Sequence, residues 1–252
     1  MAYSVPMPAT QFSAVNVVVS GHVTNDSVTL SWNAPKPSGV APRTGWRVRW
    51  ADTSDVIAEF ADSTSVGTMS LACQLDRSLE NKSVAFELVA YNSVGESEAV
   101  TSGEVFGRLS TPVLGATSRA WDSCNELITH WADTTGTGSY QHLLEFTFSN
   151  GTYSFTKDVR PGTEFAGEVV VPLDDSPDPD GFLLSAVTTS LRVVPASSSL
   201  DRDTHASVPT ASVVAAGTHG VTSGIVSRVM SSGRSLCDIA FDGAYTADSY
   251  VV

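Results

Sequence analysis

Charged side chains are scarce in this sequence, and basic side chains are the scarcest. Of 252 residues, 14 are Lys or Arg and 27 are Asp or Glu, so charged residues make up 16% and the formal net charge is −13. Nucleic-acid binding needs clustered Lys and Arg, and Arg47 and Arg49 are the one close pair within a strand-like run. We therefore expect no nucleic-acid partner, and we assign the acidic surface mainly to solubility.

Long apolar runs are also lacking. They extend over only a few residues, far below the roughly 20 that cross a bilayer, so we expect no membrane insertion. The start, Met-Ala-Tyr-Ser-Val-Pro, has neither the basic nor the apolar region of a signal peptide, which predicts synthesis in a cytoplasm. Sequons occur at Asn25, Asn81 and Asn150 and would matter only in a eukaryotic secretory route.

What the chain does contain is a recurring strand pattern. A run ends on an aromatic residue, a polar turn follows, and the next run restarts on another aromatic. The pairs are Trp32 with Trp46, Trp131 with Tyr140, and Phe241 with Tyr250. The leading aromatics are 99 and 110 residues apart, which is the length of a β-sandwich domain.

The three cysteines fall one in each repeat. Cys73, Cys124 and Cys237 have no partner within their own repeats, so no disulfide framework is expected. This usage is typical of proteins made in a reducing compartment.

Alternating apolar residues predict seven strands between Ala14 and Gly107. We place a turn at Asn25–Asp26, and a long turn at Pro35–Pro42 because its prolines cannot donate to a ladder. In the second repeat, Asn150–Gly151 predicts a two-residue type I′ hairpin.

The expected architecture is therefore all-β, with tandem seven-stranded antiparallel sandwiches. A lead at 1–13 precedes sandwiches at 14–107 and 108–206, and 207–252 forms the first three strands of an incomplete third sandwich. Three strands cannot cover both faces of a core. Either the natural chain continues, or another subunit completes the third unit, or this unit is partly disordered.

The first unit resembles a fibronectin type III domain over its whole length. Trp32 matches the second-strand tryptophan, Trp46 and Val48 match the third strand, and Ala90-Tyr-Asn-Ser-Val-Gly-Glu-Ser97 matches the late signature. Val84 stands near the position of the family's corner tyrosine and cannot make its hydroxyl hydrogen bond, which leaves a looser immunoglobulin-like topology open. The resemblance implies spacer, adhesion or protein-binding modules without a catalytic residue set.

No motif in the chain carries chemistry. The five histidines lack metal-ligand spacing, and we assign structural or surface roles to His130 and His142, which lie beside aromatics. The sequence has no Cys-x-x-Cys, no Gly-x-Ser-x-Gly elbow and no phosphate loop. We expect no catalytic residue, no cofactor and no enzyme.

One acidic segment is a candidate metal site. Asp174, Asp175, Asp178 and Asp180 offer hard oxygen ligands for calcium within seven residues. The spacing is not that of an EF-hand and two prolines stiffen the segment, so a solvated turn without regular structure is the alternative. Trp50, Trp121 and Tyr153 are candidates for a carbohydrate platform, with core packing as the alternative.

These features together predict a non-enzymatic structural or assembly protein. Proteins of this kind without a signal peptide resemble phage virion components, such as decoration, head-fibre or tail proteins, which would join subunits through sheet edges. Its partners would be other subunits of a homo-oligomer, capsid or tail, together with a host-surface receptor or glycan. The alternative is an adhesive or spacer module of a larger secreted or cell-surface protein, such as an adhesin or a polysaccharide-degrading enzyme.

Overall fold

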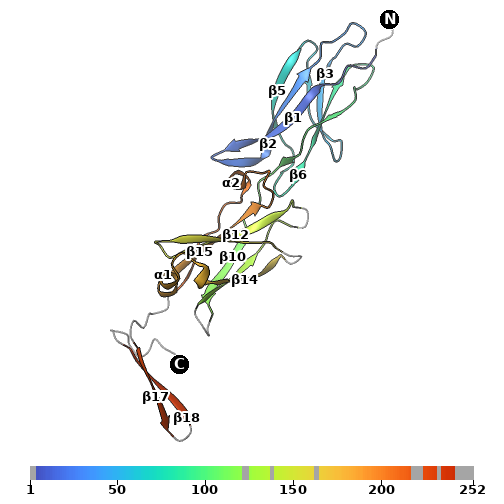
Figure 1. The fold of residues 1–252 in the computed structure, drawn as a ribbon. Helices are drawn as coiled ribbons and strands as arrows, with labels where there is room; N and C mark the ends of the chain where they lie inside the picture. The colour runs from blue at the N-terminus through green and yellow to red at the C-terminus, as the bar shows by residue number, and fades with distance from the viewer. Residues whose placement is uncertain are drawn as a thin grey trace.

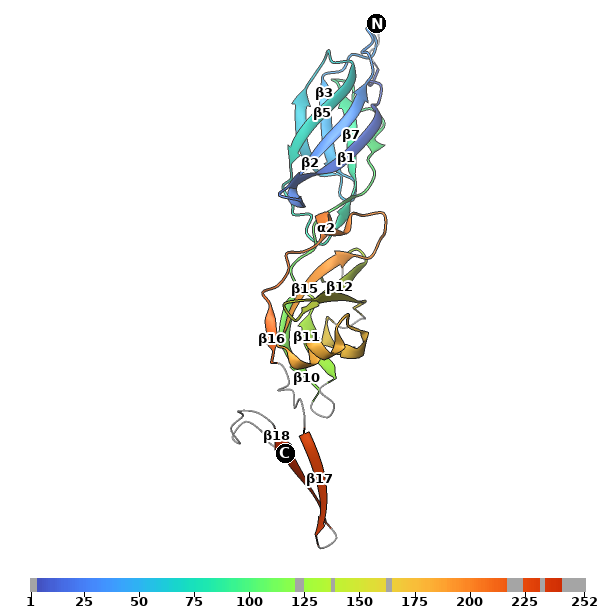
Figure 2. The same cartoon turned by 60° about the vertical axis from the view of Figure 1, so that its left-hand side comes forward.

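Two β-sandwiches follow one another along an elongated molecule, with a β-hairpin beyond the second (Figure 1, Figure 2). The computed structural model describes residues 4–120, 125–136, 139–161, 165–216, 224–231 and 234–241, and for the last two ranges it describes the backbone alone. Within these ranges, the helices are too short to cross a membrane.

The first sandwich has a three-stranded sheet facing a four-stranded one. The first sheet has the order β1 (Thr10–Val19), β2 (His22–Ala34), β5 (Gly67–Gln74), and the second has the order β4 (Val56–Ala61), β3 (Gly45–Trp50), β7 (Phe86–Tyr91), β8 (Val100–Thr101). A small third sheet pairs β6 (Ser83–Val84) with β9 (Val105–Phe106). All pairs are antiparallel, and the core is built on Trp32, Trp46, Trp50 and Phe86. The predicted seven-stranded sandwich is confirmed.

The start of the first sandwich differs from the prediction. Its first strand begins at Thr10, and Ala9 and Phe12 are buried in its core, so the last part of the expected lead, residues 9–13, belongs to the sandwich. The alternation is hidden there because Gln11 has φ 55° and the register shifts before Ser13.

The turn expected at Asn25–Asp26 lies instead at Ser20–Gly21. These two residues have φ of 52° and 82°, as a two-residue hairpin turn requires. β2 therefore runs unbroken through Asn25, which leaves that side chain free for another role.

The second sandwich repeats the strand order of the first. Its sheets are β10 (Val113–Arg119), β11 (Glu126–Ala132), β14 (Ala166–Pro172), and β13 (Ser154–Val159), β12 (His142–Ser149), β15 (Val187–Pro195), β16 (Val213–Ala215). The short helices are η1 (Leu173–Asp175), α1 (Pro179–Leu184) and α2 (Arg202–His205). Phe146, Phe148 and Phe182 are fully buried at the centre of the core.

The boundary expected at 206 is displaced, because the second sandwich takes its seventh strand from beyond it. β16 pairs with β15 through Val187↔Ala215 and its neighbours. The segment leading to β16 also follows β15, since Ser207 N–H donates to Val193 O at 2.9 Å and Thr210 N–H donates to Leu191 O at 2.8 Å. Hydroxyl side chains replace apolar alternation in this segment, so it has no strand signature in the sequence.

Serine hydroxyls attach the last segment of each sandwich in the same way. Ala90 N–H donates to Ser97 Oγ and Phe86 N–H to Ser102 Oγ, each at 3.0 Å. In the second sandwich, Val193 N–H donates to Ser207 Oγ at 2.9 Å. Each hydroxyl then donates to the carbonyl of the following residue, which satisfies a buried backbone donor without a regular ladder.

The hairpin expected at Asn150–Gly151 is a four-residue loop between Ser149 and Ser154. Gly151 alone has a positive φ there, 88°. The Asn150 carboxamide oxygen accepts from the N–H groups of Thr152 and Tyr153 at 3.0 and 2.8 Å. A side chain that bonds its own turn stabilises this loop in place of a type I′ turn.

The third unit is described as one hairpin. β17 (Gly224–Ser231) pairs with β18 (Arg234–Phe241) through eight consecutive residue pairs. The run that ends on Phe241 therefore forms a strand, and the next run, expected to restart on Tyr250, lies outside the described residues. The three ways of completing this unit stay predictions.

Candidate functional site: a clamped domain junction and the pocket beside it

The linker between the sandwiches is held from the first sandwich by two asparagines. Arg108 N–H donates to Asn25 Oδ1 at 2.6 Å, and Ser110 N–H donates to Asn81 Oδ1 at 2.8 Å. The Asn81 carboxamide also donates to Ser110 Oγ at 3.0 Å. Asn81 adopts φ 62°, a left-handed conformation in which asparagine is strongly enriched. The linker is thus joined to the first sandwich through the side chains of two asparagines for which the sequence predicted no such role.

The second sandwich holds the same linker from the other side. Leu109 N–H donates to His205 O at 3.1 Å, and Arg108 Nε donates to Ala206 O at 3.1 Å. The Tyr140 hydroxyl donates to Gly107 O at 2.7 Å. Leu109 is 2% exposed and packs in the second core. A linker bonded on both sides and anchored in a core restricts interdomain motion.

Aromatic packing and close backbone approach complete the junction. The Phe106 and Tyr140 rings meet edge to face with centroids 5.3 Å apart, a favoured aromatic geometry. At Gly107, a Cβ atom would lie 1.9 Å from Leu79 O, so no other residue fits. Burial raises the pKa of Tyr140, which keeps its hydroxyl protonated as a donor.

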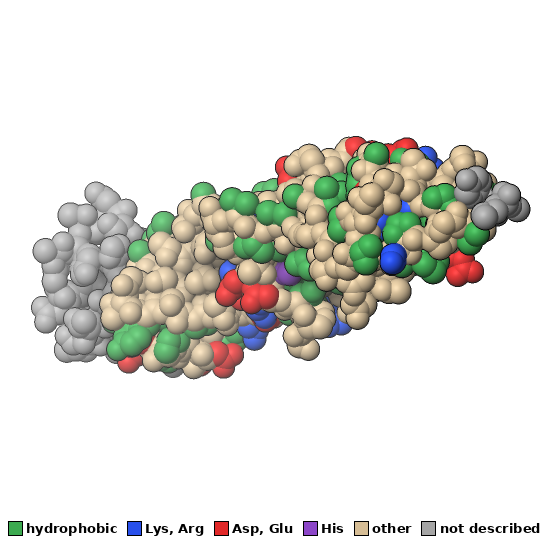
Figure 3. Space-filling view, turned by 90° about the horizontal axis from the view of Figure 1, so that it is seen from above, with side chains coloured by type: hydrophobic (Ala, Val, Ile, Leu, Met, Phe, Trp, Pro, Cys, Tyr) green, Lys and Arg blue, Asp and Glu red, His purple; other side chains and the backbone are tan. Residues whose placement is uncertain are grey.

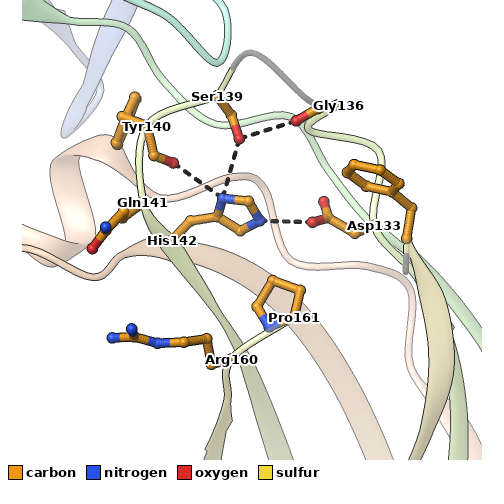
Figure 4. Close-up of a pocket in the computed structure, with 9 residues that line it drawn as sticks. Asp133, Gly136, Ser139, Tyr140, Gln141, His142, Arg160 and Pro161 are labelled. Atoms are coloured by element: carbon orange, nitrogen blue, oxygen red, sulfur yellow. Dashed lines mark hydrogen bonds and ion pairs between the residues drawn. The ribbon is translucent and has the colours of Figure 1, made fainter. Parts of the chain in front are cut away.

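A polar pocket of about 280 Å³ lies in the second sandwich beside this junction (Figure 4). Its lining residues are Asp133, Gly136, Ser139, Tyr140, Gln141, His142, Arg160, Pro161 and Phe165. They come from the segment between β11 and β12, from the start of β12, and from the ends of β13 and β14. Tyr140 belongs to both the pocket and the junction.

An ion pair forms the floor of the pocket. His142 Nε2 lies 2.6 Å from Asp133 Oδ2, and the two side chains are 9% and 0% exposed. Burial lowers the pKa of His142, but its hydrogen bonds to Asp133 and to Tyr140 O outweigh burial, so the pKa is raised. Burial raises the pKa of Asp133, but its bonds to His142 and Thr135 outweigh burial and lower it. Both shifts favour the form in which His142 is an imidazolium and Asp133 a carboxylate.

A serine, a histidine and an aspartate lie in contact here, as in a hydrolytic triad: Ser139 contacts His142, and His142 contacts Asp133. Their hydrogen bonds are not those of a triad, however. His142 Nδ1 faces Tyr140 O at 3.1 Å and Ser139 Oγ at 3.3 Å. With Nε2 facing the Asp133 carboxylate and Nδ1 facing a carbonyl oxygen that can only accept, both ring nitrogens are placed as donors, and the raised pKa of His142 favours the same form. Ser139 Oγ donates to Gly136 O at 3.2 Å. Nucleophile activation needs an unprotonated base, so this arrangement fastens a loop.

The acidic segment is helical, contrary to the expected irregular turn. Asp174 and Asp175 lie in η1, and Asp178 caps α1 by accepting from Gly181 N–H at 3.3 Å. Pro179 occupies the first helical position, where a missing N–H is harmless. No three His, Cys, Asp or Glu side chains in the described ranges come together as metal ligands. The calcium hypothesis for Asp174, Asp175, Asp178 and Asp180 finds no support in this geometry.

The candidate surface aromatics separate into different environments. Trp50 is 1% exposed in the first core, and its Nε1 donates to Asp76 Oδ1 at 3.0 Å. Tyr153 is 50% exposed on the β12–β13 loop, and Trp121 lies outside the described residues. Trp50 and Tyr153 therefore do not share a platform.

Charged side chains are sparse in this protein, at 16% of the residues. Figure 3 shows one face on which polar side chains and backbone prevail and charged side chains are few. Several of the charged groups are paired: Arg192 and Arg202 both bind Glu145 on the outer face of the second sandwich. Such a surface has no strong attraction for polyanions.

No family model and no curated protein matches this sequence. Among solved structures, the chicken interferon gamma receptor alpha chain is 15% identical, with 84% of this chain and 98% of that chain covered and a TM-score of 0.36. A two-domain fibronectin type III segment of chicken tenascin is 15% identical, covering 82% and 98%, with a TM-score of 0.37. Chicken CNTN1 FN1–FN3 domains are 10% identical, covering 85% and 67%, with a TM-score of 0.38.

Likeness at these identities and TM-scores carries no conclusion about function. The fold class follows from the strand order itself: three-stranded sheets face four-stranded sheets in two consecutive units. The protein is thus a tandem β-sandwich of the fibronectin type III or immunoglobulin-like kind. This architecture is typical of structural and adhesive modules, and function has to be argued from surfaces.

Sequence reasoning did not find the junction or the pocket. Asn25 was assigned to a turn and a sequon, Asn81 to a sequon, and His142 to a structural or surface role without a partner, while Asp133 was not singled out. Their one sequence signal is their position next to expected strand ends and turns. A polar side chain there often bonds to backbone, but the partner cannot be read from local sequence.

Proposed function

We propose that this chain is a non-enzymatic structural protein, a stiff spacer of tandem sandwiches that assembles with further copies of itself. The clamped junction carries the proposal, since a linker bonded from both sandwiches keeps them in one orientation. A protein that only tethers two binding domains has no need of this. The lack of a nucleophile-activating arrangement in the described pocket supports a mechanical role.

Within this class, we propose a virion component of a phage, such as a decoration, fibre or tail protein, with the virion as its location. A low-charge, hydroxyl-rich acidic surface and serial sandwich units support this. Its partners would be other subunits of the particle. Electron microscopy of the purified protein, together with light scattering, tests assembly: regular multimers or filaments are expected. A monomer at all concentrations would count against an assembly role.

The stiffness of the junction is tested by removing the two asparagines. The Asn25→Ala/Asn81→Ala double variant loses the clamp from the first sandwich, so small-angle X-ray scattering should show a broader range of interdomain distances than in the wild type. Asn33→Ala is the matched control, because Asn33 lies on β2 and bonds Gln11 and Thr68 away from the junction. A wild-type protein already as variable as the double variant would refute the stiff spacer.

The second candidate is an adhesive module of a larger secreted or cell-surface protein. The pocket favours it: Phe165 is 39% exposed and lines the cavity together with the exposed Arg160. An exposed ring and polar groups around one hollow suit a glycan. A glycan array with wild type and Phe165→Ala tests this. Binding that the variant loses supports adhesion, and no binding to any glycan removes this candidate.

A further inference from the structure

One strand at the margin of the first sandwich lacks the features that protect sheet edges. Edge strands expose unpaired N–H and C=O groups, and native proteins blunt them with charges, proline, bulges or short length. β5 has eight residues, no charged residue and no proline, and it pairs with β2 through eight consecutive positions without a register shift. Its other side has no paired strand among the described residues.

Every other edge in the described sheets is blunted. β1, β4 and β10 have register shifts, and β8 and β16 have two and three residues. β13 contains Lys157 and Asp158, and β14 contains Glu168 and ends at Pro172. Both strands of the β17–β18 hairpin contain charged residues. β5 is therefore the exception within the described part of the chain.

The direction of the free groups on β5 follows from its register. Leu75 N–H donates to Asp26 O at 2.7 Å, directly after the pair Ser27↔Gln74. In an antiparallel pair, hydrogen-bonded and non-hydrogen-bonded positions alternate. The N–H and C=O groups of Thr68, Ser70, Ala72 and Gln74 therefore point away from β2, and the side chains of these four residues are exposed.

We propose that β5 pairs antiparallel with β5 of a second copy around a twofold axis, which makes one continuous sheet from two first sandwiches. A second copy can approach this edge because β5 has no charged residue. Copies with a net charge of −13 repel each other, and a neutral edge facing its own neutral equivalent brings no like charges together. A twofold contact uses the same patch on both copies, and Met69 and Leu71, partly exposed at this margin, become covered.

This pairing rests on the proposed assembly function and names the contact through which assembly occurs. Ser70→Pro removes an outward N–H and none of the bonds to β2, a position where proline is tolerated on an edge. The matched control is Thr156→Pro on β13. There Asn150 N–H donates to Tyr153 O at 3.1 Å, and the same alternation along Ser149↔Ser154 and Thr147↔Thr156 turns the Thr156 N–H outward.

Light scattering during size-exclusion chromatography over a concentration series separates the outcomes. Wild type and Thr156→Pro should dimerise alike, and Ser70→Pro should raise the dissociation constant about 100-fold, since two symmetry-related bonds are lost at about tenfold each. A Ser70→Pro dimer as tight as wild type overturns β5 pairing while assembly stands. A wild-type monomer at every concentration overturns assembly as well.

A measurement on the wild type guards against misfolding of the variant. Amide hydrogen exchange at Ser70 and Ala72 should slow as protein concentration rises, because the pairing protects outward N–H groups. The amide of Thr156 provides the internal reference and should exchange at one rate throughout. Concentration-independent exchange at Ser70 and Ala72 in a dimeric sample would place the contact elsewhere and overturn the pairing.

Discussion

The two sandwiches have one strand order and two different cores. The first core is built on tryptophans: Trp32 and Trp46 meet edge to face with centroids 5.6 Å apart. The second is built on phenylalanines: Phe148 stacks on Phe155 at 5.2 Å, and Phe155 meets Phe182 of α1 at 5.1 Å. The fold therefore requires large inward side chains at alternating positions, while the kind of aromatic decides what surrounds the core.

Indole N–H groups explain the polar fringe of the first core. A buried tryptophan usually needs an acceptor, and Trp46 Nε1 donates to Asp62 Oδ2 at 2.9 Å. Arg43 then lies 4.5 Å above the Trp46 ring and pairs with Asp62 at 3.5 Å. The second core contains one tryptophan, Trp131, and its buried Nε1 has no hydrogen-bond partner among the described residues, as is also true of Trp32 Nε1 in the first core. The buried ion pair of the second sandwich, Asp133 with His142, lines the pocket and contains a histidine whose pKa is raised.

Truncating the central aromatic of each core should have the largest effect and should be greater in the first sandwich. Trp46→Ala should lower the free energy of unfolding by about 5 kcal/mol and Phe146→Ala by about 4 kcal/mol, because the former also leaves Asp62 and Arg43 without the indole. Calorimetry and circular dichroism measure both. Val18→Ala, at a side chain 54% exposed, should change stability by less than about 0.5 kcal/mol. If Trp46→Ala and Phe146→Ala lowered the free energy of unfolding equally, the hydrogen bond and cation contact of the indole would add nothing measurable to stability.

Removing the His142 side chain should cause the next-largest loss of stability. It should also distinguish the two sandwiches by the pH dependence of their unfolding. His142→Ala leaves the Asp133 carboxylate buried without its partner, a loss of about 3 kcal/mol. The raised pKa of His142 contributes stability that is full below about pH 6.5 and is lost as pH rises through its folded pKa. The lowered pKa of Asp133 contributes stability that is lost as pH falls through its folded value.

Urea unfolding between pH 5 and 9, roughly the range of histidine titration, measures this difference. In wild type, the second sandwich should weaken as pH rises, and His142→Ala should abolish that slope. The first sandwich is the control, since the Arg43–Asp62 pair keeps its charges over this range. A slope that persists in His142→Ala would assign the pH dependence to another group.

The serine hydroxyls that bind the last segment of each sandwich should contribute equally to the stability of both sandwiches. They therefore test whether the same geometry has the same energetic effect in each. Ser102→Ala and Ser207→Ala each leave a buried backbone N–H, of Phe86 or Val193, without its acceptor. Each should lower the free energy of unfolding by about 2 kcal/mol. Ser199→Ala, at an exposed serine, is the matched control. A loss of stability in only one of the two sandwiches would show that the same hydrogen-bond geometry contributes differently to each.

Removing the N-cap of α1, which has no counterpart among the described residues of the first sandwich, should have the smallest effect on stability. Asp178→Ala removes the acceptor of the Gly181 N–H and should cost about 1 kcal/mol. Asp180→Ala, inside α1, should cost less. Isothermal titration with calcium should give no heat for wild type or either variant. Heat in wild type that Asp178→Ala removes would restore the calcium site.

Regular alternation made much of the fold predictable. Trp46, Val48 and Trp50 repeat every second residue, and the structure buries all three in one core. The prediction failed where hydrogen-bonding side chains replace alternation. Ser207 lies in the second sandwich rather than in a third unit, and Asp178 begins a helix. The Asp133–His142 pair lay beyond prediction because its partners come from opposite sides of a loop.

By itself, the sequence determined the β-sandwich class, the tandem order and the aromatic cores. These follow from the spacing and the volume of the apolar side chains, which can be read locally. In every strand, burial of alternate apolar side chains away from water favours the same arrangement. Only the tertiary structure decided the clamp by Asn25 and Asn81, the raised pKa of His142 and the unprotected edge at β5. Each of these features depends on whether a polar group finds a hydrogen-bond partner in a distant segment of the chain. Local sequence shows one partner of such a bond but does not show the other.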